Sequence, residues 1–223
     1  GNKGFKWAMS EAATEDYPTT QIDNGKTGKC VKLETRLTGD LGNMVGMPIA
    51  AGNLFIGSFD MLNAITNPLS ATRFGTPFYN KPLRLTGYYK YKAGEQFYEN
   101  GEYTSRKDIF NIYAIFYDGV KYDSAGKGTD VTLDGNLPNQ NYEHSSMVAL
   151  ALVSNPQETE GDEWKFFDIP FDYQRYGKKI DEARLAKGEY KIGIIFASSK
   201  DGATFEGAPG STLLIDEVEL IYE

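Results

Sequence analysis

Few residues of this 223-residue sequence could act as a nucleophile or as a base near neutral pH. His144 is the only histidine and Cys30 the only cysteine. Hydrolases of the Ser/His/acid or Cys/His kind need an imidazole beside the nucleophile, and no pattern here places one beside His144. Catalytic zinc generally draws on two or three His or Cys ligands, which the sequence does not offer. We therefore expect His144 to be a solvated loop residue and Cys30 a buried free thiol, and we identify no catalytic residue.

Carboxylates are the one abundant chemical group, with 31 Asp and Glu residues. Glycoside hydrolysis requires only a pair of them flanking the bond, about 5 to 10 Å apart in a cleft. No motif fixes a partly buried acid opposite a second one. Whether the protein is an enzyme stays open at this point, and a non-catalytic role is favoured.

Asp216 stands out in the last predicted strand. Strand alternation puts it on one face with Leu214, Val218, Leu220 and Tyr222, unless a bulge intervenes. A carboxylate among apolar neighbours must be paired, hydrogen-bonded or metal-bound, because burying it alone is costly. The alternatives are a structural calcium ion, which carboxylates and loop carbonyls bind well, and hydrogen bonds from backbone amides or a basic partner.

Aromatic residues are frequent, with 15 Tyr and 2 Trp. In one predicted strand, Tyr113 and Tyr117 share a face opposite a more apolar one, and in another Tyr88 shares a face with Arg84. Two such strands side by side would form an aromatic and polar surface suited to a sugar ring, and these four residues are our predicted ligand contacts. Alternatively, the tyrosines fill the edges of the fold or pack under loops.

The elements that carry these residues are almost all strands. Alternating patterns bounded by turn residues predict strands at 31–37, 53–59, 83–91, 109–117, 146–153, 163–171, 190–198 and 211–222. One short helix is expected at 181–186, ended by Gly188. So many strands, without helical periodicity, predict an all-β sandwich of two packed sheets in which Trp7 and Trp164 are core anchors.

The net charge of the chain disfavours some classes of binding partner. The formal net charge is −8 and the sequence pI is about 4.8, which opposes binding to nucleic acid or to an anionic membrane, so neutral ligands fit better. No stretch approaches the roughly 20 apolar residues of a spanning helix. We expect a single domain over 1–223, with Gly1 as a remnant of tag removal and with a native leader, and further upstream sequence, cut away.

Several segments together form a pattern that is more specific than any single motif. Two of them are the glycine- and proline-rich Phe74-Gly75-Thr76-Pro77-Phe78 and the closing Ile215-Asp216-Glu217-Val218. The full set is 50–57, 67–69, 74–78, 85–91, 188–191, 196–202, 205–213 and 215–220. In these segments the chain resembles the family called the putative carbohydrate metabolism domain, and the resemblance covers nearly the whole chain from about Phe5.

The resemblance implies a jelly-roll sandwich of two antiparallel sheets, similar to carbohydrate-binding modules. It also implies a cell-envelope lipoprotein, at the outer-membrane surface or in the periplasm, anchored by lipid through a removed N-terminal leader and carrying an upstream domain. The acid of the last strand, here Asp216, serves a structural calcium ion in similar jelly rolls.

We therefore expect a non-catalytic module that binds a polysaccharide or oligosaccharide, with no cofactor beyond a structural calcium ion. A glycoside hydrolase using two carboxylates is the second hypothesis. The third is a structural or adhesive module, which would present an exposed apolar patch to another protein.

Overall fold

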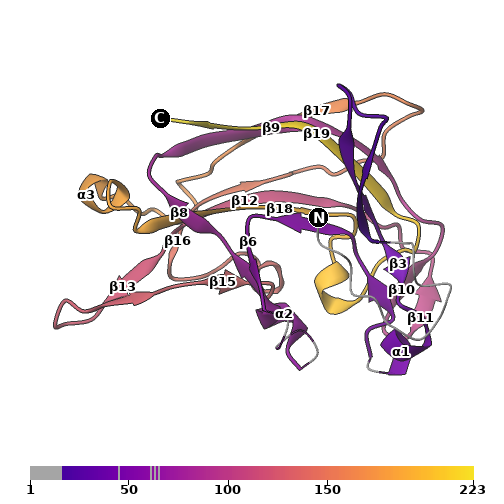
Figure 1. The fold of residues 1–223 in the computed structure, drawn as a ribbon, viewed down its shortest axis with the longest axis horizontal. Coiled ribbons are helices and arrows are strands. Elements are labelled where there is room, and N and C mark those ends of the chain that lie inside the picture. The colour runs from indigo at the N-terminus through magenta and orange to yellow at the C-terminus, as the bar shows by residue number, and fades with distance from the viewer. Residues whose placement is uncertain (1–16, 45, 61, 63, 65) are drawn as a thin grey trace.

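The computed structural model describes residues 17–223 except 45, 61, 63 and 65, and its main feature is a pair of antiparallel sheets facing each other (Figure 1). Sheet 1 has the strand order β1 (Thr19–Ile22), β2 (Cys30–Glu34), β19 (Thr212–Tyr222), β9 (Pro82–Lys92) and β17 (Lys165–Pro170). Sheet 2 has the order β16 (Met147–Leu152), β12 (Asn111–Asp118), β18 (Tyr190–Ala197) and β5 (Asn53–Phe55), and β8 (Thr76–Phe78) also pairs with β18.

The order of these strands defines a jelly roll. Along the chain, β2 is in sheet 1, β5 and β8 in sheet 2, β9 in sheet 1, β12 and β16 in sheet 2, β17 in sheet 1, β18 in sheet 2 and β19 in sheet 1. The resulting neighbours, β2-β19-β9-β17 and β5-β18-β12-β16, are those of two interlocked Greek keys. The predicted fold class is therefore confirmed.

The main core lies between the two sheets. Alternate residues of the longer strands point inward, among them the fully buried Leu33, Leu85, Ile112, Phe116 and Leu213. All eight predicted strand regions contain strands, although the region 53–59 is divided at Ile56.

The outer face of sheet 2 is covered by a further layer. It is built by β6 (Gly57–Phe59), β7 (Thr72–Phe74), β15 (Leu133–Asp134), the 3-10 helix η2 (Pro138–Gln140) and the helix α2 (Pro68–Ala71), which lie below sheet 2 in Figure 1. A second apolar cluster fills the space, and it contains Tyr113 and Tyr117, which are 2% and 0% exposed.

The expected exposed surface at Tyr113 and Tyr117 is therefore wrong. The Tyr117 hydroxyl donates to the Phe74 carbonyl oxygen at 2.7 Å, so burial leaves that polar atom satisfied. The idea that this strand and the strand of Tyr88 lie side by side is also wrong, because β12 and β9 belong to different sheets.

Part of the last strand faces the opposite way from our expectation. Before the bulge, Leu213 and Ile215 point inward in place of Leu214 and Asp216. A bulge between Asp216 and Glu219 shifts the register against β9, and beyond it Leu220 packs against the core, as expected. Glu217, in the bulge, has a φ of 50°. Asp216 accordingly lies on the outer face of sheet 1, half-buried, where two backbone amides reach it.

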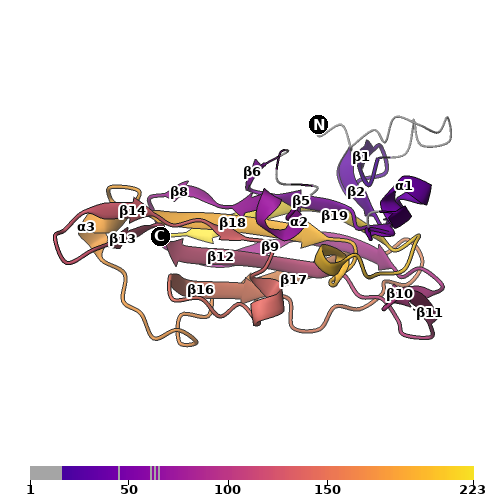
Figure 2. The ribbon, with the colours of Figure 1, turned by 90° about the horizontal axis from the view of Figure 1, so that it is seen from below.

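The remaining elements are short. They are β3 (Arg36–Leu37), α1 (Gly39–Met44), β4 (Ile49–Ala50), β10 (Phe97–Glu99), β11 (Glu102–Thr104), β13 (Val120–Tyr122), β14 (Gly128–Asp130), α3 (Glu182–Leu185) and η3 (Gly202–Thr204). The predicted helix is α3, whose first turn is capped by the Asp181 side chain, and Gly188 follows it with a φ of 70°. Figure 2 shows α1 and the β10–β11 hairpin at one end of the sandwich and α3 at the other.

The structure tests several of our expectations for single residues. Cys30 is buried and His144 is exposed, as predicted. Trp164 is half-buried on the outer side of sheet 1, under the Lys90 ammonium, and is not a core anchor. Trp7 and Gly1 lie outside the described residues. In the described part of the chain, no helix is both long and apolar enough to cross a bilayer.

Candidate functional site

A cleft of about 620 Å³ opens at the end of the sandwich where β3, α1, β10 and β11 lie (Figure 1). We call it the end cleft. Three segments far apart in the sequence meet there: the β10–β11 hairpin, the α1 region between β3 and β4, and the η3 turn that follows β18. The residues that line the cleft are Leu37, Asn43, Gly46, Pro48, Tyr98, Asn100, Gly101, Tyr103, Thr204, Phe205 and Glu206.

The hairpin supplies two aromatic rings. Asn100 and Gly101 form its two-residue turn with φ values of 52° and 89°, the left-handed conformations that a tight hairpin turn requires. This turn makes Tyr98 and Tyr103 direct cross-strand partners, and their ring centroids lie 5.3 Å apart in an edge-to-face arrangement. Tyr103 is 51% exposed, so one ring of the pair is open to a ligand.

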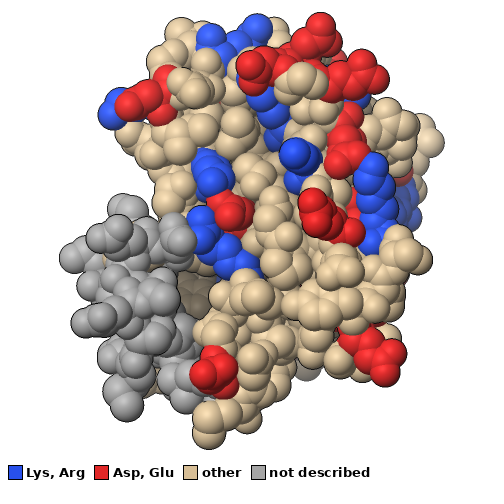
Figure 3. All heavy atoms as spheres, turned by 90° about the vertical axis from the view of Figure 1, so that its right-hand side faces the viewer, with Lys and Arg blue, Asp and Glu red and all other residues tan. Residues whose placement is uncertain are grey.

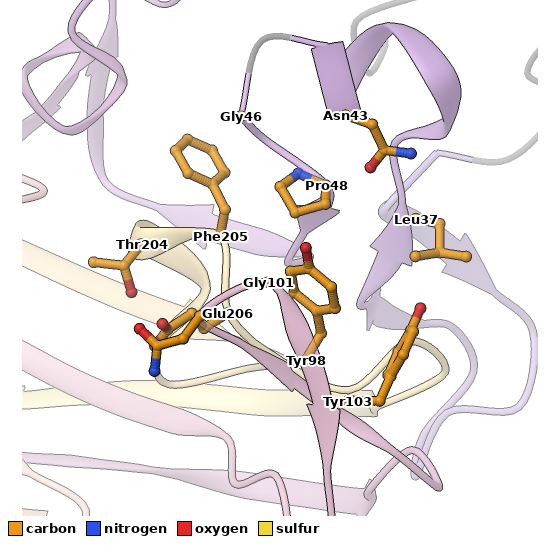
Figure 4. Close-up of a pocket in the computed structure, with 11 residues that line it drawn as sticks. Leu37, Asn43, Gly46, Pro48, Tyr98, Gly101, Tyr103, Thr204, Phe205 and Glu206 are labelled. Carbon is orange, nitrogen blue, oxygen red and sulfur yellow. The ribbon is translucent and has the colours of Figure 1, made fainter.

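The η3 turn supplies a third ring. Phe205 adopts a φ of 62°, which is uncommon for a residue other than glycine, and its amide donates to the Gly202 carbonyl oxygen at 3.1 Å. The turn is fixed to the hairpin by a pair of backbone hydrogen bonds between Tyr98 and Gly207, at 2.9 and 3.1 Å. Figure 4 shows the rings of Tyr98 and Tyr103 pointing toward Pro48 and Leu37, with Phe205 beside the η3 turn.

Five polar side chains accompany these rings. Within the described part of the chain, no hydrogen bond or ion pair involves the hydroxyls of Tyr98 and Tyr103, the side-chain amides of Asn43 and Asn100, or the carboxylate of Glu206. The cleft thus combines apolar ring surface with free donors and acceptors. This combination suits a ligand that has C–H faces and many hydroxyl groups.

The charged side chains around the end cleft differ in whether they are already paired. Arg106 donates to Glu99 at 3.0 Å and also pairs with Asp201, and its guanidinium lies over the Phe97 ring at 4.2 Å. The hydrogen bond from Arg106 lowers the pKa of Glu99 below its usual value. Arg106 and its two carboxylates therefore satisfy one another, and Glu206 is the one charged residue among the described residues that line the cleft.

A buried carboxylate holds the η3 segment in place from beneath. Asp108 is 2% exposed, and its Oδ2 atom accepts from the Ser199 hydroxyl at 2.5 Å, the Ser211 hydroxyl at 2.7 Å and the Ala208 amide at 2.8 Å. Its Oδ1 atom accepts from the Ile109 amide at 2.9 Å. Burial raises the pKa of Asp108 above its ordinary value. Ala208 follows the lining residues Phe205 and Glu206 closely in the sequence, so this hydrogen bond fixes the chain just beyond them.

None of the four predicted ligand contacts lines the end cleft. Tyr113 and Tyr117 are buried beneath the additional layer. Tyr88 and Arg84 do share the outer face of β9. Arg84 donates to Asp168 at 2.6 Å, and Lys26 lies 4.0 Å from the centroid of the Tyr88 ring, so both are already engaged. A ligand-binding role for Tyr88 and Arg84 stays a prediction.

The surroundings of Asp216 correspond to the hydrogen-bond alternative. Its Oδ2 atom accepts from the Thr27 amide at 3.1 Å and its Oδ1 atom from the Glu217 amide at 2.9 Å. The described residues include no group of three or more His, Cys, Asp or Glu residues that could hold a metal ion, whereas calcium takes six to eight oxygen ligands. The donor set around Asp216 therefore does not fit calcium. The structural calcium ion implied by the resemblance stays an untested prediction.

A signal for the missed residues is present in the sequence. Asn-Gly flanked by alternating residues is the strongest short-range indication of a hairpin, and Asn100-Gly101 sits between Tyr98 and Tyr103. This pattern alone predicts that the two tyrosines meet. That Tyr98 and Tyr103 lie in the same cleft as Phe205 depends on tertiary packing, which no local sequence pattern predicts.

Comparisons with known proteins agree with the family resemblance. The sequence model of the family described as "Putative carbohydrate metabolism domain" matches residues 1–221. No curated protein is significantly similar to the chain.

Solved structures include two clear relatives. A crystal structure described as a putative glycoside hydrolase from Bacteroides vulgatus has 54% identity and a TM-score of 0.85, covering 93% of this chain and 78% of that chain. A second, described as a putative glycoside hydrolase from Bacteroides thetaiotaomicron, has 51% identity and a TM-score of 0.84. That match covers 94% of this chain but only 58% of the other, so this chain spans little more than half of the second relative.

A third structure is far more distant. It is TmCBM61 in complex with β-1,4-galactotriose, with a TM-score of 0.36 and 10% identity, covering 94% of this chain and 85% of that chain. That likeness is too low to indicate a shared ligand.

Proposed function

Because the chain belongs to the family described as "Putative carbohydrate metabolism domain", we propose that it binds oligosaccharides or polysaccharides in the end cleft without cleaving them. One observation carries the proposal. Three aromatic rings line one cleft of about 620 Å³, together with five polar side chains that have no hydrogen-bond or ion-pair partner among the described residues. Because these side chains are open to solvent, their donors and acceptors are free to exchange water for the hydroxyl groups of a sugar.

Each part of the cleft has a task in this proposal. A pyranose ring presents a C–H face that stacks on the exposed ring of Tyr103, while Tyr98 supports that ring from its edge. The amides of Asn43 and Asn100 donate to and accept from hydroxyl groups, and the Glu206 carboxylate accepts from them. Phe205 closes the opposite side of the cleft.

The second candidate is hydrolysis, because the two relatives at 54% and 51% identity are described as putative glycoside hydrolases. Hydrolysis needs two carboxyl groups across the scissile bond. Among the described residues that line the end cleft, Glu206 supplies one and no second carboxylate accompanies it. We therefore favour binding. A cell-envelope location and a lipid anchor stay predictions of the resemblance.

A glycan array followed by calorimetry on the strongest hits tests the proposal. Tyr103→Ala removes an exposed ring of the cleft and should weaken binding at least tenfold, since stacking is lost while the fold is spared. Tyr79→Ala is the matched control, because Tyr79 is 58% exposed and does not line the cleft, so this variant should bind like the wild type.

The same samples separate the alternatives. New reducing ends that appear with the wild type and disappear with Glu206→Gln would establish a hydrolase and reject the non-catalytic proposal. An array without any hit would favour the structural or adhesive module. Equal losses in both tyrosine variants would place the ligand elsewhere.

A further inference from the structure

The charge inventory of the end cleft distinguishes between two classes of glycan. Its lining contains one anionic side chain, Glu206, and no Lys or Arg among the described residues. The nearby cation, Arg106, is held by Glu99 and Asp201 and lies over the Phe97 ring. An anionic sugar entering the cleft would therefore meet the Glu206 carboxylate and no Lys or Arg among the described residues that line it.

The molecular surface agrees with this inventory. Figure 3 shows the end of the molecule at which the cleft lies. Charged side chains of both signs gather over its upper part, and the lower part, at the height of α1 and β11 in Figure 1, is mostly uncharged. The formal net charge of −8 adds a general repulsion toward anions.

Glu206 has a favourable role toward uncharged sugars. Its carboxylate has no partner in the described residues, although its own backbone is fixed by the η3 turn, where its amide donates to the Asp201 carbonyl oxygen at 3.3 Å. Charge-assisted hydrogen bonds from hydroxyl groups to a carboxylate are shorter and stronger than those between neutral groups. A sugar hydroxyl can satisfy this carboxylate, whereas a uronate carboxylate cannot.

We propose that the end cleft is specific for neutral glycans, with Glu206 as the residue that binds sugar hydroxyls and excludes uronates and other anionic sugars. This inference rests on the proposed function, since it assigns a ligand class to the same cleft. The exclusion is electrostatic, so it weakens as salt screens the repulsion.

Chemically matched ligands test it. Tetrasaccharides of glucose, mannose and galactose are compared by calorimetry with the same tetrasaccharides oxidised at C6 to carboxylates. For any tetrasaccharide that binds, we expect oxidation to weaken binding by about tenfold at low salt, which corresponds to about 1.4 kcal/mol. The loss should shrink in 0.5 M salt.

Two variants identify the residue responsible. Glu206→Gln should bind the neutral sugar several-fold more weakly and should bring the neutral and oxidised forms within about threefold of each other. Glu102→Gln changes the net charge equally on the hairpin that forms one side of the cleft, but Glu102 itself does not line the cleft, so this control should keep most of the tenfold preference.

The outcomes separate the two proposals. Binding of oxidised sugars that equals or exceeds binding of neutral ones overturns the specificity while leaving sugar binding intact. A preference that survives Glu206→Gln unchanged overturns the assignment to Glu206. Absence of binding by every neutral and oxidised sugar overturns the proposed function and this inference together.

Discussion

Replacing Asp108 by Asn tests the account of the buried anchor under the η3 segment. The carboxylate accepts four hydrogen bonds, from Ser199, Ser211, Ala208 and Ile109, and no basic group is among its partners. The Asn side chain has the same shape but only one oxygen. Whichever way the amide is turned, its NH₂ group faces a backbone N–H that needs an acceptor.

The magnitude follows from that mismatch. Leaving one buried donor unsatisfied costs about 1 to 3 kcal/mol, so we expect the Asp108→Asn variant to lose about that much free energy of unfolding at pH 7. Asp162→Asn is the control. The Asp162 side chain is fully exposed, with a weak ion pair to Lys90, and its loss should cost less than about 1 kcal/mol.

The pH dependence of the loss is a sharper test. Burial raises the pKa of Asp108 in the folded state above its unfolded value, so the folded state takes up a proton more readily than the unfolded state. The wild type therefore gains stability from this group as pH falls through the folded pKa, and the gain is complete below the unfolded pKa. Asn cannot take up the proton, so the difference between wild type and variant should grow as pH falls from 7 toward 4.

Urea unfolding at several pH values, followed by intrinsic fluorescence, measures both quantities, and effects of the other carboxylates cancel in the difference. A difference that stays constant or shrinks at low pH would refute the raised pKa. A variant as stable as the wild type at pH 7 would refute the claim that all four hydrogen bonds matter.

Three further predictions concern other parts of the molecule. Tyr117→Phe should lower the free energy of unfolding by about 1 to 2 kcal/mol, because the buried Phe74 carbonyl loses its donor, as chemical denaturation would measure. Gly202→Ala should cost about 1 to 3 kcal/mol, since its new Cβ atom would meet the Ala51 Cβ atom at 2.3 Å in a buried site; a thermal melt like that of the wild type would contradict this. Addition and chelation of calcium should leave the melting temperature unchanged, because amides already satisfy Asp216, and a calcium-dependent rise that Asp216→Asn abolishes would establish the metal site.

Local patterns were sufficient to predict the sandwich and eight regions that contain its longer strands, but not the short strands such as β10 and β11. Period-2 alternation identified the regions of sheet 1 because one face of that sheet is in solvent, and the helix before Gly188 follows from its cap and its terminator. Leu214 and Asp216 of the last strand were assigned to the wrong face for a local reason as well. A bulge of this kind inverts which residues face the core on one side of it. Glutamate rarely adopts a left-handed φ, so Glu217 gave no sign of the bulge in the sequence.

The candidate site was harder to predict because it depends on which surfaces are covered. The face of β12 that carries Tyr113 and Tyr117 looked polar enough for solvent, yet chain segments on both sides of β12 in the sequence fold back over it. A nearly continuous apolar run, as in Ile112 to Phe116, is the available warning that both faces of a strand are buried. The convergence of Tyr98, Tyr103 and Phe205 has no comparable signature.

The layer over sheet 2 has a consequence for how this sequence can change. In an ordinary sandwich, every second position of a strand faces water, and substitutions accumulate there at little cost. From Asn111 to Tyr117, β12 has no such position, because every residue is buried. Sheet 1 and the loops around the end cleft keep that freedom. A family built on this plan can diversify what its loops bind while the middle strand stays nearly the same, and libraries designed to alter binding should leave that strand untouched.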